Sequence, residues 1–174
     1  MASRVAMERK RKKQAFEMTV RRAQIMLEKG LEAVLKGKYK RARERFKQSV
    51  EFHRTADALT YWAWMEHALG NTAMAILLCH KAIDVDPDFG NPYNDIGSYL
   101  IAMGKWDEAI PWLEKAAAAP RYQPRQFPHM NLGKVYLAKS MPRKALHEFQ
   151  KALTFSPDNQ QLKRLVETVE KSFH

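Results

Sequence analysis

Apolar and small residues recur along the chain at helical spacing, in segments that come in pairs. In each pair, a small residue lies midway along the first segment, and an alanine followed four positions later by a larger side chain lies near the start of the second. The small residues are Gly30, Ala63, Gly97 and Gly133. The alanines and their larger partners are Ala42 and Phe46, Ala75 and Cys79, Ala109 and Leu113, and Ala145 and Phe149. The pattern predicts four antiparallel helix pairs, in which each small residue lets the second helix approach closely.

The ends of these segments carry helix stop signals. Gly37, Gly70 and Gly104 stand where the first helix of a pair must end, since glycine accepts the left-handed conformation of a helix C-terminus. Pro87 and Pro157 follow second helices, which they would end. The four alanines of the pattern are separated by 33, 34 and 36 residues. That period of about 34 residues is the length of one helix–turn–helix unit.

Residues 23–159 resemble the tetratricopeptide repeat (TPR) family. The residues that carry the resemblance most fully are Ile96, Gly97, Gly104, Trp106, Ala109 and Ala116, and then Leu132, Gly133, Tyr136, Ala145, Phe149, Ala152 and Pro157. Ser49, Cys79 and Ser140 depart from the family pattern. The resemblance implies an all-α fold, a right-handed α-solenoid of about four helix-turn-helix units with a C-terminal capping helix.

The boundaries expected from the repeats divide the chain into six segments. They are a basic helical extension over 1–22, repeats over about 23–55, 56–89, 90–125 and 126–159, and the capping helix over 160–174. The extension carries an inward stripe of Phe16, Val20, Ala23 and Leu27. The capping helix carries a stripe of Leu162, Leu165, Val166, Val169 and Phe173.

Composition excludes several classes of protein. The hydrophobic fraction of 45% is too high for global disorder, and no window approaches 18 consecutive apolar residues, so we expect no membrane-spanning helix. The basic N-terminus has no apolar stretch behind it, so we expect no secretory signal. Cys79 is the single cysteine, which excludes a disulfide framework and favours a reducing compartment, hence a cytoplasmic location.

Catalytic and metal-binding patterns are missing from the sequence. No two of the six histidines have the four-residue spacing of a helical metal site, and neither a glycine-rich phosphate loop nor a serine nucleophile elbow occurs. We therefore expect a protein that is not an enzyme and that has no cofactor and no metal.

The net charge of +11 is concentrated in the first third of the chain. Residues 1–54 contain 17 Lys and Arg against 6 Asp and Glu, whereas residues 55–174 contain 13 of each kind. Such an asymmetry points to an anionic partner: nucleic acid, an acidic protein or a lipid surface. Two clusters are candidates for one anion-binding surface: Arg9, Lys10, Arg11, Lys12 and Lys13, and then Lys38, Lys40, Arg41, Arg43, Arg45 and Lys47. The first cluster is equally well explained as a solvated helix end.

In the TPR family the first helices of the repeats line a concave surface on which partner peptides lie. The resemblance therefore implies a groove lined by Thr60, Trp64, His67, Asn91, Asn94, Ser98, Ile101, Phe127, Met130, Lys134 and Leu137. Trp64 stands out: Trp62 takes the core position, so Trp64 points roughly 200° away from it around the helix. An exposed tryptophan of this kind would anchor an apolar or amphipathic segment.

One partner of the family is disfavoured. The family's groove for chaperone tails uses Lys, Asn and Arg at fixed first-helix positions. Those positions are occupied here by Leu27, Leu31, Tyr61, Asn91 and Asp95. Binding of an Hsp70 or Hsp90 C-terminal tail is therefore not expected.

Two functions remain open. The first is a protein-interaction adaptor whose groove takes a peptide or an amphipathic helix. The alternative is a nucleic-acid-associated protein in which residues 4–54 bind phosphates and the repeats serve as a scaffold. Base stacking requires aromatic residues among the cations, and residues 1–54 contain only Phe16, Tyr39, Phe46 and Phe52. This favours the adaptor.

Overall fold

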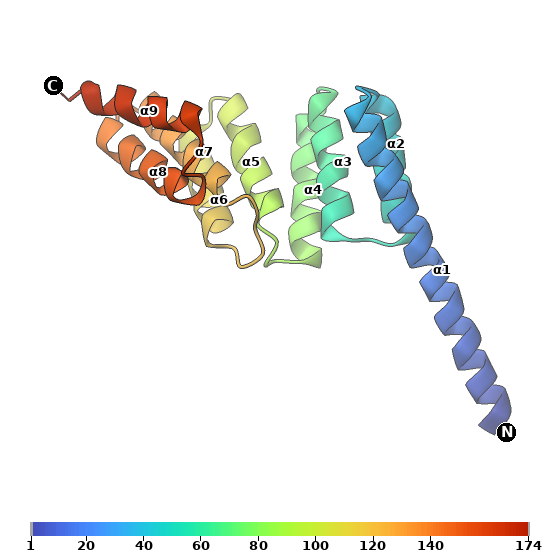
Figure 1. Ribbon diagram of the computed structural model, residues 1–174. Coiled ribbons are helices and arrows are strands. Elements are labelled where there is room, and N and C mark those ends of the chain that lie inside the picture. Colours follow the sequence, from blue (N-terminus) through green and yellow to red (C-terminus); the bar gives the residue numbers. More distant parts are fainter. Residues whose placement is uncertain (1, 174) are drawn as a thin grey trace. The chain divides into compact units, whose positions relative to one another are not determined.

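The computed structural model describes residues 2–173, which form helices and no strand (Figure 1). The chain divides into two compact units, Met1–Val85 and Asp86–His174. The first unit contains α1 (Ala2–Leu35), α2 (Tyr39–Phe52), α3 (Ala56–Ala68) and α4 (Thr72–Val85). The second contains α5 (Asn91–Ala102), α6 (Trp106–Ala118), α7 (Gln126–Ala138), α8 (Pro142–Phe155) and α9 (Gln160–Lys171).

In the first unit, consecutive helices pack against one another, α1 on α2, α2 on α3 and α3 on α4. The ring of Phe46 is fully buried in a cluster with Ala33, Ala42 and Met65, and it stacks on Tyr61 with 5.3 Å between the ring centroids. Helix α3 begins at a capping threonine, because the side chain of Thr55 accepts a hydrogen bond of 3.1 Å from the backbone N–H of Ala58. Burial of Phe46 thus links the first two helix pairs.

The N-terminal part of α1 does not pack on α2. The expected extension and the first helix of the first repeat form one continuous helix, whose N-terminal half projects beyond α2 (Figure 1). The predicted inward stripe is therefore wrong at Phe16, which is 58% exposed and forms a T-shaped contact with the His53 ring, with 5.6 Å between the centroids. The stripe becomes buried at Ala23, where the carbonyl oxygen of Ala23 accepts a 2.8 Å hydrogen bond from the hydroxyl of Ser49.

In the second unit, α5 packs on α6, α7 on α8, and α5 also lies beside α7. Helix α9 covers the end of this unit, and Leu162, Val166 and Val169 are buried there against Phe149. Contrary to the prediction, Phe173 does not continue that stripe, because α9 ends at Lys171 and leaves the Phe173 ring 39% exposed.

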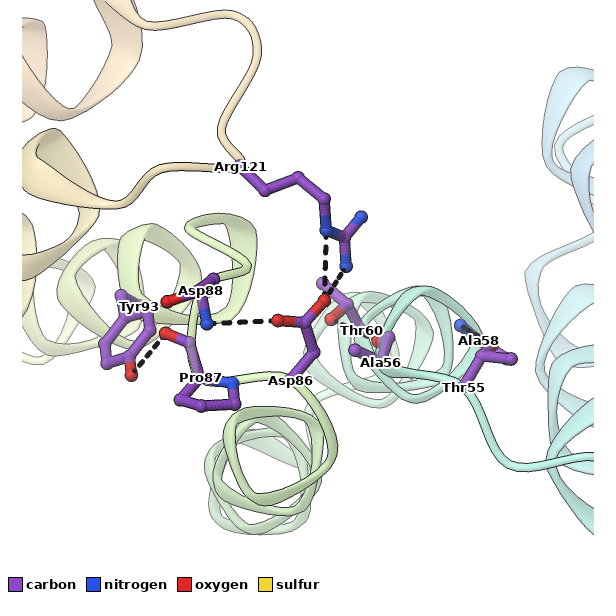
Figure 2. A network of polar contacts seen from close by, with 9 residues as sticks. All are labelled: Thr55, Ala56, Ala58, Thr60, Asp86, Pro87, Asp88, Tyr93 and Arg121. Atoms are coloured by element: carbon purple, nitrogen blue, oxygen red, sulfur yellow. Dashed lines mark hydrogen bonds and ion pairs between the residues drawn. The ribbon is translucent and has the colours of Figure 1, made fainter.

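A contact between two loops closes the N-terminal end of the second unit. Arg121, in the loop that follows α6, donates two hydrogen bonds to Asp86, from Nε at 3.0 Å and from Nη2 at 2.5 Å (Figure 2). Its guanidinium lies over the Phe89 ring, and this arginine lowers the pKa of Asp86 through the hydrogen bond and its charge. Gly90 is required beside this contact, since a Cβ there would lie 2.5 Å from the Cβ of Tyr122. The loop between α6 and α7 is therefore held against the start of the second unit.

Small residues on first helices face large ones on second helices, as the sequence pattern predicted. A Cβ on Gly133 would lie 2.3 Å from Cε1 of Phe149, a ring that is fully buried. Gly104, by contrast, ends α5 with a positive φ of 72° and has no atom within 4 Å of where its Cβ would be. The two glycines are thus needed for different physical reasons, close packing and backbone conformation.

Replacing Gly133 or Gly104 by alanine distinguishes the cost of lost close packing from the cost of a strained backbone. Gly133→Ala forces a methyl group into the Phe149 ring and should lower the free energy of unfolding by about 3 kcal/mol. Gly104→Ala is strained only by the left-handed backbone and should cost about 1 kcal/mol. Urea unfolding followed by circular dichroism measures both values. Equal costs at the two positions would mean that close packing does not limit the α7–α8 pair.

Candidate interaction surface

On α3, the predicted lining residues differ in accessibility. Trp64 is 43% exposed, as the sequence predicted. His67 is half-buried, its Nδ1 lies 3.1 Å from the hydroxyl of Thr72, and burial lowers its pKa. Thr60 is a correction, because its side chain is buried and its hydroxyl donates a 2.8 Å hydrogen bond to the carbonyl oxygen of Ala56. Trp64 is therefore the residue of this helix that a partner can cover.

On α5 and α7, apolar and polar side chains share one surface. Phe127 is 44% exposed and Leu137 is 37% exposed, and Lys134 beside them is exposed. Met130 is half-buried because it packs against the α8–α9 core. The remaining predicted residues are all half-buried: Asn91, Asn94, Ser98 and Ile101. We refer to these eight side chains of the two helices as the α5–α7 surface.

A pair of amides joins α5 to α7. The Nδ2 of Asn131 donates a 3.0 Å hydrogen bond to Oδ1 of Asn94. The sequence placed Asn94 in the predicted groove lining and did not include Asn131. In the structure one acceptor of Asn94 is already used by Asn131, so the pair positions the two helices as well as facing a partner. Only the three-dimensional neighbourhood of α5 and α7 brings these amides together.

Asp95 follows Asn94 in the chain, and its carboxyl group has a strongly shifted pKa. Burial raises the pKa of Asp95 from its ordinary value of 3.8 to about 7, although a hydrogen bond with Asn94 opposes the shift. The pKa of Tyr122 is also raised, by burial and by the charge of Asp95. The carboxyl group of Asp95 therefore gains or loses its charge near neutral pH.

A second polar cluster joins α7 to α8. Burial alone would raise the pKa of Glu148, but a 2.7 Å contact with Nδ1 of His129 and a 3.1 Å contact with the ammonium of Lys151 outweigh it, so the pKa is lowered. The His129 ring stacks on Phe155, with 5.6 Å between the centroids. These groups and Tyr136 line an open hollow of about 330 Å³. The cluster keeps Glu148 ionised and ties the two helices; sequence spacing gave no signal for it.

The basic clusters do not form one surface, which corrects the expectation from the sequence. Helix α1 rises about 1.5 Å per residue, so Lys13 lies about 20 Å from Met26, which Arg45 of the second cluster contacts, and about 33 Å from Leu35, where the turn to α2 begins. All five cations from Arg9 to Lys13 are exposed. In the second cluster Arg43 is already neutralised, since its guanidinium bonds Glu44 at 2.8 Å and approaches Glu66 at 3.9 Å.

The part of the chain that the structure describes offers no metal site. Over residues 2–173, no three His, Cys, Asp or Glu side chains lie close enough together to hold an ion. The thiol of Cys79 is buried and forms no disulfide. None of the helices described combines the length and the apolar character that crossing a membrane requires.

Known proteins share the fold. Residues 93–119 match the model of a tetratricopeptide repeat family. The structure of PilF from Pseudomonas aeruginosa has a TM-score of 0.81 at 21% identity, over 88% of this chain and 70% of that chain. YrrB, described as a TPR protein with an unusual peptide-binding site, has a TM-score of 0.65 at 20% identity, over 83% of this chain and 74% of that chain. The first TPR of Spaghetti (RPAP3), bound to the HSP90 peptide SRMEEVD, has a TM-score of 0.63 at 22% identity, over 70% of this chain and 98% of that chain.

No curated protein sequence matches the chain. The solved structures confirm the all-α solenoid fold predicted from the sequence, and the family model matches within the third of the expected repeats, over residues 93–119.

The raised pKa of Asp95 predicts a dependence of stability on pH. The folded value, about 7, lies above the ordinary value of 3.8, so this contribution to stability is complete below about pH 4 and is lost as the pH rises through about 7. Asp95→Asn keeps the shape without the charge. At pH 8 the variant should exceed the parent protein by about 2 kcal/mol in free energy of unfolding, and at pH 4 it should not exceed it.

Urea unfolding at pH 4, 6 and 8 measures this difference. The exposed Asp158 of the same unit provides the control Asp158→Asn, which removes one carboxylate without the buried surroundings. A constant difference between Asp95→Asn and the parent protein across these pH values would contradict burial as the cause.

Proposed function

We propose that this chain, a tetratricopeptide-repeat protein, is a non-catalytic adaptor that binds a peptide or an amphipathic helix on the faces of its first helices. The observation that carries the proposal is the exposure of large apolar side chains there, Trp64 at 43% and Phe127 at 44%. Tryptophan is among the residues that contribute most to binding free energy when a partner covers them. The repeat family is in general non-catalytic, which is consistent with this role.

The composition of the α5–α7 surface supports a peptide ligand. Phe127 and Leu137 offer apolar area, and the Asn94–Asn131 pair offers amide groups of the kind that bond a peptide backbone. A surface with apolar anchors beside a few fixed polar groups suits an amphipathic segment, which presents both kinds of group along one face. Lys134 adds a positive charge beside the apolar area.

The named relatives bind peptides in the same architecture, YrrB through an unusual peptide-binding site and the RPAP3 repeat with an HSP90 peptide. For this chain we propose a different ligand from that chaperone tail. The first-helix positions that grip a tail carboxylate in the family hold Leu27, Leu31 and Tyr61 here, which supply no cation. An apolar or amphipathic segment of a cytoplasmic protein fits these positions better.

Trp64→Ala tests the adaptor function, with Leu77→Ala as the matched control. Leu77 is 47% exposed on α4 of the same unit, so both changes remove an exposed apolar side chain. Peptides selected on the intact protein from a randomised display library provide the ligand, and fluorescence anisotropy measures its affinity. Trp64→Ala should weaken binding about 30-fold or more, and Leu77→Ala less than about threefold. A library that yields no binder, or equal losses in the two variants, would contradict the proposal.

Nucleic-acid binding is the second candidate function, and the exposure of Arg9–Lys13 on the projecting part of α1 favours it. Because this interaction would rest on phosphates alone, the affinity for a random-sequence DNA fragment should fall steeply with salt. Replacement of Arg9, Lys10 and Arg11 by Gln should reduce the slope of log affinity against log salt by about 0.9 for each phosphate that is no longer neutralised. No binding at low salt would leave solubility as the role of this cluster.

A further inference from the structure

A half-open hollow beside the turn between α1 and α2 is lined mainly by cations, most of which are exposed. Its volume is about 190 Å³, and it lies between the last turns of α1 and the first half of α2. Its charged lining residues are Lys29, Glu32, Lys36, Lys38, Arg41 and Arg45. Lys29 and Lys36 come from outside the cluster recognised in the sequence, because only the antiparallel packing of the two helices brings them beside Arg41 and Arg45.

The five cations of this hollow are not neutralised by the protein. None of them forms an ion pair with any of the residues that the structure describes. Arg43 on the same helix is different, because Glu44 and Glu66 balance its charge. Arg45 donates hydrogen bonds only to the neutral groups of Gln48 and Met26. The hollow therefore concentrates positive charge against the single carboxylate of Glu32.

The start of α2 adds to this positive potential. A helix N-terminus carries partial positive charge and unpaired N–H groups, which acidic or capping side chains normally balance. The first turn of α2 contains no acidic residue, and Lys38 at its N-cap provides no side-chain hydrogen bond. The last carbonyl groups of α1 are already occupied, since those of Ala33 and Val34 accept from the backbone of Lys38 and Gly37. Cations at this position thus repel the helix end as well as each other.

A bound anion would remove both of these repulsions. We propose that the hollow is a binding site for a compact polyvalent phosphate of the pyrophosphate class, separate from the interaction surface of the first helices. Arg41 and Arg45, four residues apart on one face of α2, supply planar guanidinium groups that bind phosphate oxygens in pairs. Lys29 and Lys36, one α-helical heptad apart on α1, supply point charges from the other side.

The shape and lining of the hollow favour this class of anion over a nucleic acid. The cations line one small, half-open hollow, whereas a nucleic-acid strand needs a track of cations along an extended groove. No aromatic residue lines the hollow, so no base would be stacked there. The exposed run Arg9–Lys13, which would have to extend such a track, lies at the other end of α1. Recognition at this site would therefore be of phosphate groups alone.

Isothermal titration of the full chain with sodium pyrophosphate, at constant ionic strength, tests the site. Inorganic phosphate in a parallel titration distinguishes a site for one phosphate group from a site for two. The parent protein should bind one pyrophosphate per chain, saturably and more tightly than phosphate. The double variant Lys36→Gln/Arg41→Gln should bind at least about tenfold more weakly. The matched control Arg9→Gln/Lys10→Gln removes the same net charge from the same end of the sequence and should change the affinity less than about threefold.

If the Lys36→Gln/Arg41→Gln variant failed to fold, it would also lose binding. The stability of the variant without ligand distinguishes a loss of folding from a loss of the site. Because the variant relieves repulsion, its urea midpoint at low salt should equal or exceed that of the parent protein. Lys29→Gln, which leaves the start of α2 intact, should weaken pyrophosphate binding by itself. Binding that does not saturate, an equal loss in the Arg9→Gln/Lys10→Gln control, or a random-sequence DNA fragment that displaces pyrophosphate and depends on the same side chains would each overturn the proposal.

Discussion

Each helix pair depends on close contact between a small residue of the first helix, in most pairs a glycine, and a larger side chain of the second helix that packs over it. A Cβ on Gly30 would lie 2.4 Å from the Phe46 ring, and one on Gly97 would lie 2.5 Å from Leu113. In the α3–α4 pair, Ala63 and Cys79 take the corresponding places, so a smaller partner compensates for the added methyl group. Close approach of the two backbones fixes which face of every helix is buried, and so which side chains remain for a partner.

This constraint explains how much of the fold the sequence could predict. A small residue, an alanine and a large residue at fixed spacing determine where two helices meet, and the structure has helix pairs at those places. The same pattern does not predict which side chains are exposed on a helical segment that no other helix covers. The exposure of Phe16 and Phe173 was missed for that reason, since Phe16 lies on the part of α1 that extends beyond α2 and Phe173 lies beyond the end of α9.

Contacts between polar side chains were the least predictable part of the candidate site. Helical spacing gives the direction of a residue from its own axis, and both Thr60 and Trp64 point to the predicted face. Whether that face is covered depends on neighbouring helices, and Thr60 is buried while Trp64 is not. The same holds for the pairing of Asn94 with Asn131, whose partners are separated by a whole repeat in the sequence.

Departures from the family pattern, by contrast, are local and have local explanations. Ser49 replaces a buried alanine, and its hydroxyl is satisfied by the carbonyl oxygen of Ala23, so the cost of burying a polar group is avoided. Ser140 replaces the turn glycine and still adopts a positive φ of 56°. The repeat therefore tolerates a substitution where the backbone geometry or one hydrogen bond can be kept, and at the close-approach position it holds Ala63 only opposite the smaller side chain of Cys79.

The charge of the first third of the chain is best understood against this packing. Like-charged pairs such as Arg41 and Arg45 cost a helix about 0.2–0.5 kcal/mol each, whereas burying one side chain the size of Phe46 contributes about 1.5–3 kcal/mol. The α1–α2 pair can therefore fold with its cations unbalanced. On α2 the protein neutralises Arg43, which approaches Glu66 of α3, and leaves Arg41 and Arg45 open beside the end of α1. Glu32 is the single carboxylate among the residues that line this hollow, so the excess of positive charge there is a local property of the α1–α2 pair.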